Sequence, residues 1–169
     1  MKSKNIYYLN WIKDRKLVRT TQGKYIQLEL GENLYNNLCQ IIVDSRQIIK
    51  KITPVSSHGS ELHEHAYKAA IYSLVYKWEV GKTGLLEAWA QLGSRLVRGH
   101  YFTNGNKRVG LLAMINFVHA CGFHLRDDKN NEILLKKWER LLLEVATAQS
   151  EALAVELVKA HLLLEIIGS

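Results

Sequence analysis

Apolar residues recur every three or four positions along most of the chain from residue 32 onward, which is the spacing of amphipathic helices. The tryptophans Trp78, Trp89 and Trp138 fall on these apolar faces and are predicted core residues. Ser150 precedes the last periodic stretch, where its hydroxyl can cap a helix N-terminus. The pattern predicts an all-α fold, a bundle of about six helices. They are expected at residues 32–50, 61–80, 82–98, 106–122, 132–147 and 151–167.

A different periodicity precedes the first predicted helix. The segment Lys16–Leu30 alternates apolar and polar residues, and Thr21-Gln22-Gly23 has the composition of a turn between two short runs. This segment predicts a small N-terminal β-hairpin.

Composition narrows the class of protein. The chain has 169 residues, 47% of them apolar, and one proline, which together favour a single helical domain over residues 1–169. Cys39 and Cys121 stand far apart, so neither a disulfide framework nor a cysteine-rich metal site is expected, and a reducing cytoplasm suits them. The N-terminus lacks the apolar core of a signal peptide, and the apolar stretch Leu162–Ile167 is too short to span a membrane. We expect a cytoplasmic protein.

The formal charge of +7 favours acidic partners, meaning nucleotides, nucleic acids or an acidic protein surface. Much of the excess lies in the first two dozen residues, which carry no known nucleic-acid reader motif. Such a run is more often a solvated surface, so the sequence argues against nucleic-acid binding.

The loop between the third and fourth predicted helices holds few apolar residues except Phe102, which can anchor it in the core. Asn106 opens the next helix, whose first N–H groups lack intrahelical partners and face outward with the positive end of the helix dipole. Such a helix start binds phosphate, and Gly105 allows the backbone to approach a ligand closely. Arg108 adds a planar fork of donors, and Lys107 adds a mobile point charge.

His100 ends the helix before this cradle, and its imidazole can accept a proton near neutral pH, as the base for a hydroxyl nucleophile must. Base and cradle together suit in-line attack of a hydroxyl on a nucleotide phosphate. Taken singly, a histidine at a helix end is more often structural, because short motifs match by chance.

The combined pattern His100-x-Phe102-x-x-Gly105-Asn106-x-Arg108 resembles the signature of the Fic/Doc family. It is most similar to the death-on-curing (Doc) toxin branch, because Lys107 replaces the usual glycine. The resemblance extends over residues 57–167, the expected Fic core, and leaves residues 1–56 as an N-terminal extension and flap region. It implies the Fic fold, with a helix on each side of the motif.

The family's roles carry over position by position. His100 resembles the base that takes the proton from the target hydroxyl, and Phe102 the residue that packs the loop into the core. Gly105 and Asn106 correspond to the anion cradle, and Arg108 to a phosphate-binding arginine.

Lys107 bears on the reaction that the resemblance implies. Family members with glycine at this position typically transfer AMP, whereas the toxin branch with lysine resembles a kinase that phosphorylates a threonine of elongation factor Tu and stops translation. The resemblance therefore implies phosphate transfer from ATP to a Ser or Thr hydroxyl first, and AMP transfer second. A third reading is a non-catalytic Fic-fold protein that binds nucleotide or regulates a partner.

Three further expectations follow from the resemblance. Asn104 occupies the position where the family usually has an acidic residue for Mg²⁺, so its amide oxygen can face the ion without a charge. The chain has no convincing copy of the family's inhibitory helix motif, which makes a separate cognate antitoxin the natural control. The loop Lys50–Gly59 lies where the family carries a flap that binds the target backbone by strand addition, with an ordinary interhelical loop as the alternative.

Overall fold

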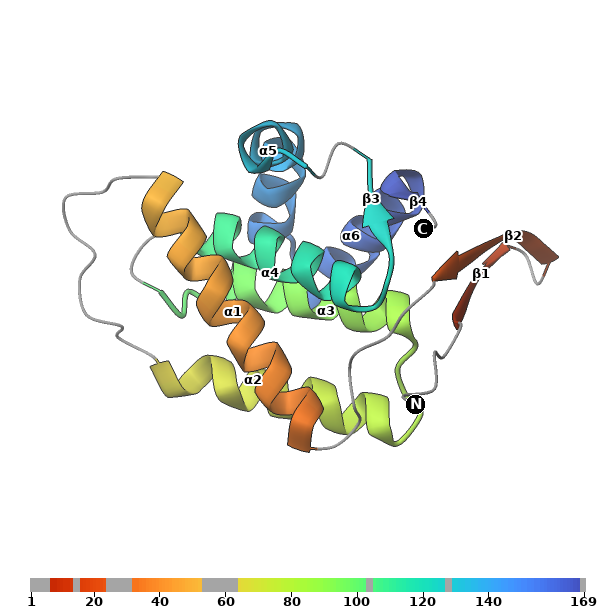
Figure 1. Ribbon diagram of the computed structural model, residues 1–169, viewed down its shortest axis with the longest axis horizontal. Coiled ribbons are helices and arrows are strands. Elements are labelled where there is room, and N and C mark those ends of the chain that lie inside the picture. The colour runs from red at the N-terminus through yellow and green to blue at the C-terminus, as the bar shows by residue number, and fades with distance from the viewer. Residues whose placement is uncertain are drawn as a thin grey trace, which may run out of the picture.

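The computed structural model describes the backbone of residues 7–13, 16–23, 32–52, 64–102, 105–126 and 129–167. Within these ranges six helices and two small antiparallel sheets are formed, which confirms the predicted all-α class (Figure 1). The helices are α1 (Glu32–Ile52), α2 (Glu64–Glu79), α3 (Leu85–Arg98), α4 (Asn106–Ala120), α5 (Asn131–Thr147) and α6 (Glu151–Glu165). The strands are β1 (Tyr7–Lys13), β2 (Lys16–Gly23), β3 (His124–Leu125) and β4 (Ile166–Ile167).

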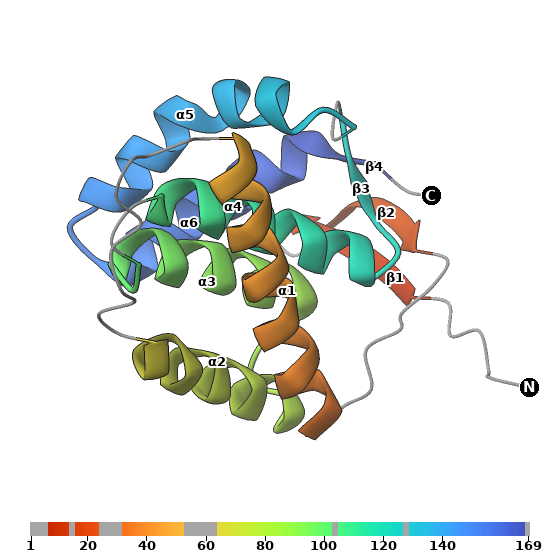
Figure 2. The ribbon, with the colours of Figure 1, turned by 60° about the vertical axis from the view of Figure 1, so that its left-hand side comes forward.

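Helices α3 and α4 run side by side through the centre of the bundle. α1 crosses over α4 and also contacts α2, while α5 and α6 cover the other side (Figure 2). α4 is buried on most of its surface because apolar or small residues occupy nearly all of its positions, the arrangement expected of a central helix. Its buried residues are Val109, Gly110, Leu111, Leu112, Ala113, Met114, Ile115, Phe117 and Val118.

Glycines allow the two central helices to approach closely. A Cβ added at Gly93 of α3 would lie 2.9 Å from the Sδ atom of Met114 on α4. Trp89 of α3 and Trp138 of α5 are buried as predicted, whereas Trp78 packs against the core with part of its ring exposed. The contact between α3 and α4 therefore sets where the C-terminal end of one helix lies relative to the N-terminal end of the other.

A polar pair, buried Ser45 and partly buried Asn116, links α1 to α4. The Asn116 amide of α4 donates to the Ser45 hydroxyl of α1 at 3.0 Å, and that hydroxyl donates to the Ile41 carbonyl at 2.7 Å. Buried polar groups are stable only when they are hydrogen-bonded, so this chain of bonds favours one relative position of the two helices.

The N-terminal hairpin was predicted in the wrong place. Strand β1 pairs antiparallel with β2, from Lys13 opposite Lys16 to Tyr7 opposite Gly23, so the predicted turn Thr21-Gln22-Gly23 lies inside a strand. The segment Tyr7–Lys13 is rich in aromatic and β-branched residues, which favour a strand as strongly as the segment after it does. Residues 24–30 of the predicted hairpin lie outside the described residues.

Several helix ends also differ from the prediction, and the structure gives the reason for two of them. α3 begins at Leu85 and not at residue 82, because Gly81 adopts a left-handed φ of 69° and Gly84 is an extended N-cap. α6 ends at Glu165, and Ile166–Ile167 pairs with His124–Leu125 as a short sheet. Ser150 caps α6 as predicted, its hydroxyl accepting the Leu153 N–H at 3.1 Å. No helix among the described residues is long and apolar enough to cross a membrane.

Candidate active site

The candidate site lies where α3 ends and α4 begins. Gly99 closes α3 by donating its N–H to the Arg95 carbonyl at 2.8 Å, and His100 follows with a φ of 50°. A positive φ is uncommon for a residue with a side chain, although histidine tolerates it better than most. This conformation turns the chain sharply away from the helix, and it leaves the His100 side chain exposed to solvent.

Tyr101 explains why the residue before His100 is glycine. The Tyr101 ring lies against Gly99 so closely that a Cβ at this position would collide with it. The ring is half-buried, and burial raises the pKa of the Tyr101 hydroxyl, with Arg95 acting in the opposite direction. Tyr101 therefore packs as a neutral side chain that supports the turn.

Asn106 clamps the loop on itself. Its side-chain oxygen accepts the Phe102 N–H at 3.0 Å, and its amide nitrogen donates to the Phe102 carbonyl at 2.6 Å. Both backbone groups of Phe102 are thereby satisfied by the first residue of α4. The Asn106 side chain thus shapes the loop of the predicted anion cradle, whereas the backbone N–H of Asn106 is one of the free N–H groups at the helix start.

Gly105 is the N-cap of α4, with φ 80° and ψ 12°. A side chain here would be strained, and its Cβ would lie 3.3 Å from Ile49 Cγ2 of α1. Gly105 also has no side chain to cap the helix, and the first turn of α4 holds no acidic residue. The positive end of this helix therefore lacks a local carboxylate to offset it, and it favours an anion.

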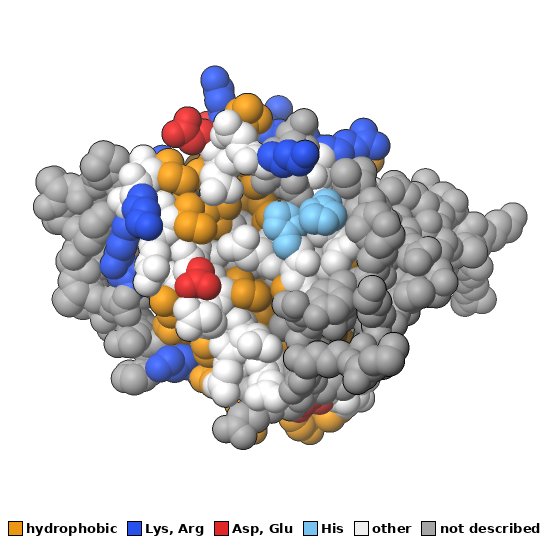
Figure 3. Space-filling model, viewed as in Figure 1, with side chains coloured by type: hydrophobic (Ala, Val, Ile, Leu, Met, Phe, Trp, Pro, Cys, Tyr) orange, Lys and Arg blue, Asp and Glu red, His pale blue; other side chains and the backbone are white. Residues whose placement is uncertain are grey.

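Lys107 and Arg108 are exposed on the first turn of α4. Lys50 and Lys51 lie in the last turn of α1, next to Ile49, whose side chain lies against Gly105. Figure 3 shows a group of lysine and arginine side chains, in blue, on the left of the molecule near the C-terminal end of α1. The surroundings of the helix start are therefore cationic, as a phosphate site requires.

Two other arginines near the loop bond to neighbouring helices of the bundle. Arg98 donates to the Val145 and Ala148 carbonyls at 3.0 and 2.7 Å, at the C-terminal end of α5. Arg95 forms an ion pair with Glu151 at 2.8 Å and donates to the Ala70 carbonyl of α2 at 2.9 Å. These bonds hold the end of α3, and hence His100, against three neighbouring helices. No local sequence signal indicates such long-range partners.

The structure places His100, Phe102, Gly105, Asn106, Lys107 and Arg108 at one end of the α3–α4 pair. Asn104, the predicted metal-facing residue, lies outside the described residues. In the part of the chain that the structure describes, no three His, Cys, Asp or Glu side chains are grouped so that they could bind a metal ion.

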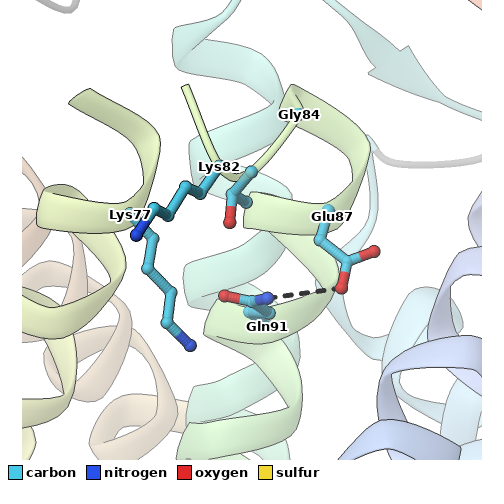
Figure 4. A pocket seen from close by; sticks show the side chains of 6 residues that line it. Lys77, Lys82, Gly84, Glu87 and Gln91 are labelled. Carbon is cyan, nitrogen blue, oxygen red and sulfur yellow. Dashed lines mark hydrogen bonds between the residues drawn. The ribbon is translucent and has the colours of Figure 1, made fainter. Parts of the chain in front are cut away.

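A separate cavity of about 390 Å³ lies at the other end of α3 (Figure 4). α3 has 14 residues, so its two ends are about 20 Å apart. On the α3 wall of this cavity, Gln91 Nε2 donates to Glu87 Oε1 one turn earlier at 3.3 Å. The cavity is too far from His100 to belong to the candidate site. Its lining residues are Lys77, Lys82, Thr83, Gly84, Glu87 and Gln91.

The sequence model of the Fic/DOC family matches residues 25–118, more than half of the chain, and the match includes the whole candidate site. The chain therefore belongs to the Fic/DOC family. Comparisons with curated proteins and with solved structures gave no match. The match begins at residue 25, upstream of the expected residue 57, so the family pattern includes α1, the helix that contacts Gly105. Members of this family are in general nucleotide-dependent transferases that modify proteins.

Proposed function

We propose that this protein transfers the γ-phosphate of ATP to a Ser or Thr hydroxyl of another protein. The observation that carries the proposal is the position of His100 on the loop before α4. The two hydrogen bonds between Asn106 and Phe102 tie this loop to the cationic start of α4. A base beside an anion site is the minimum that phosphate transfer to a hydroxyl needs.

Each residue has a distinct part in this reaction. His100 takes the proton from the target hydroxyl as its oxygen forms a bond to the γ-phosphorus. The bond from that phosphorus to the bridging oxygen breaks, and ADP leaves with the electron pair. The N–H groups at the start of α4, with Arg108, hold phosphate oxygens and stabilise the charge of the transition state. Lys107 adds a cation at the same turn.

Lys107 supports phosphate transfer over AMP transfer, because a lysine at this position resembles the Doc branch. Transfer of AMP needs attack at the α-phosphorus and not at the γ-phosphorus. The nucleotide would then have to bind with its α-phosphate, in place of its γ-phosphate, next to His100. Lysine in place of glycine adds both bulk and charge to the first turn of α4, where either phosphate would lie. AMP transfer is the alternative that the experiment below distinguishes.

Magnesium is part of the proposal only as a partner of ATP. Asn104 offers a neutral amide oxygen in place of a carboxylate, and Mg²⁺ held by such a ligand relies mainly on phosphate oxygens and water. We therefore expect the protein without nucleotide to bind Mg²⁺ weakly, and the phosphates of ATP to supply most of the affinity for the ion.

The proposed partners are a target protein and an antitoxin. The resemblance to the Doc branch makes elongation factor Tu the first target to test, with inhibition of translation as the consequence. A cytoplasmic location suits such a target. A separate antitoxin would then restrain the activity, because the chain has no convincing inhibitory motif of its own.

Label transfer tests the proposal. The protein is incubated with a bacterial lysate and Mg²⁺, using ATP labelled on the γ-phosphate or on the α-phosphate. We expect γ-label alone in a protein band, lost in His100→Ala and kept in His124→Ala, which removes another exposed histidine. Incorporation of α-label would make the protein an AMP transferase. Equal labelling by His100→Ala would rule out the proposed base, and absence of both labels would favour a non-catalytic protein.

A further inference from the structure

The ring of Phe102 is held between two helices. The Cζ atom of Arg46 on α1 lies 4.9 Å from the centroid of the ring. The Tyr67 ring of α2 lies 6.0 Å from it at an interplanar angle of 41°. Phe102 itself is only 4% exposed. The ring thus has an aromatic neighbour from α2 and a guanidinium from α1.

The position of this ring determines the geometry of the candidate site. Both backbone groups of Phe102 are bonded to Asn106, so a shift of the ring shifts the first residue of α4. His100 is only two residues before Phe102, on the same short loop. One turn beyond Arg46, Ile49 lies against Gly105. Two side chains on the same stretch of α1 therefore face the loop, one over its anchor and one against its glycine.

The chemistry of arginine suits this place. A guanidinium is planar and weakly hydrated, so it stacks on an aromatic face more readily than an ammonium does. Arg46 is half-buried, which strengthens the attraction between its charge and the ring. A leucine would cover the same apolar surface but would lack the attraction to the ring face.

We propose that Arg46 is a positioning residue for the transfer reaction. It acts through Phe102, holding the loop so that His100 and the start of α4 keep their relative positions. The proposal deepens the proposed function and rests on it. It predicts a larger effect on the rate of transfer than on the binding of ATP, because Arg46 works through the loop that carries His100 and does not act on the nucleotide directly.

The test compares Arg46→Leu with Arg46→Lys and with Arg140→Leu, a control on α5 whose side chain is 93% exposed. We expect Arg46→Leu to lower kcat for transfer by about tenfold to a hundredfold, since small displacements of catalytic groups have effects of this size. KM for ATP should stay within about twofold. Arg46→Lys should be intermediate, because the charge remains without the planar stack, and Arg140→Leu should match the natural protein.

A double-mutant cycle with Phe102→Leu shows whether Arg46 acts through Phe102. We expect the double variant to be no slower than Phe102→Leu alone. Multiplied losses, or a rise in KM for ATP in Arg46→Leu with kcat unchanged, would overturn the proposal and place Arg46 on the nucleotide.

Amide hydrogen exchange provides a readout that needs no activity. Arg46→Leu should speed the exchange of the Phe102 N–H, which is bonded to Asn106, while the control leaves it unchanged. Unchanged exchange in Arg46→Leu would overturn the proposal by itself. Absence of transfer by the natural protein would instead count against the proposed function, and the exchange result would still decide the role of Arg46 in holding the loop.

Discussion

Gly110 of α4 lies directly against Val97 of α3. A Cβ added to Gly110 would stand 2.7 Å from Val97 Cγ2, 3.0 Å from the Val97 nitrogen and 3.1 Å from the Gly93 carbonyl oxygen. Two of these three atoms belong to the backbone, which cannot rotate out of the way as a flexible side chain can. The absence of a side chain at Gly110 is therefore what allows the two helices of the site to pack at this distance.

Gly110→Ser should destabilise the fold for this reason. Forcing extra atoms into a well-packed core costs about 1–3 kcal/mol. The same substitution at Gly84 is the control, because a Cβ there meets nothing within 4 Å and serine is a good N-cap. The free energy of unfolding, measured by urea denaturation, should fall for Gly110→Ser and stay the same or rise for Gly84→Ser. Equal stability of the two variants would contradict the close packing.

Asn106→Ala should impair the site more than the fold. Each lost hydrogen bond to Phe102 contributes about 0.5–1.5 kcal/mol to stability. Transfer should slow by about tenfold or more, because the loop loses the clamp that positions it. Asn130→Ala is a matched control, since this asparagine also makes two bonds, to the Glu132 and Ile133 N–H groups at the start of α5. A melting curve and a transfer assay on both variants would separate the two effects, and parallel losses of activity would refute a special role for Asn106.

Lys107→Gly should change which part of ATP is transferred. Removing the lysine restores the residue that the AMP-transferring members typically carry, so we expect less γ-label and more α-label in the target. Lys136→Gly removes another exposed lysine, on α5, and should alter neither label. If Lys107→Gly lowers transfer without changing its type, Lys107 does not select the reaction.

Asn104→Asp should strengthen the use of Mg²⁺. A carboxylate at this position adds a charged oxygen ligand, which hard divalent cations prefer. The Mg²⁺ concentration that gives half-maximal transfer should fall, and turnover should rise. Asn130→Asp, far along the chain on the α5 cap, is the control. A variant that binds nucleotide and Mg²⁺ yet transfers nothing would favour the non-catalytic alternative.

His161 should make stability depend on pH. Its ring packs 4.4 Å from that of Trp138, and burial lowers the pKa of His161, with Glu165 opposing the shift and Lys137 adding to it. Because the folded state then binds a proton less readily than the unfolded state, protonation favours unfolding. The free energy of unfolding should therefore fall as the pH drops below about 6.5, the ordinary pKa of histidine.

Urea denaturation at about pH 7.5 and about pH 5.5, on either side of that pKa, measures this dependence. The loss of stability between the two should be smaller in His161→Gln, which does not titrate. His124→Gln changes an exposed histidine and serves as the control. An identical loss in His161→Gln would show that burial of His161 does not contribute.

The helices were predictable because each signal is local. A 3.6-residue apolar period over one stretch, such as that of α1, is enough to indicate which face will be buried. The hairpin was misplaced for the converse reason: alternation and turn composition occur in several adjacent segments, and the pairing of Lys13 with Lys16 depends on which strands meet. The end of α6 at Glu165 likewise depends on β3, a segment some forty residues earlier in the chain.

The sequence by itself determined the family and the candidate base and phosphate cradle, because the nine residues from His100 to Arg108 are contiguous and their chemistry is carried by residue type. Only the tertiary structure decided what holds them. Three contacts join residues from different elements: Arg46 of α1 over Phe102 of the loop, Arg98 of α3 at the end of α5, and Gly110 of α4 against Val97 of α3. Such contacts arise when helices pack, and no periodicity or motif within one segment specifies which residue of another helix will meet it.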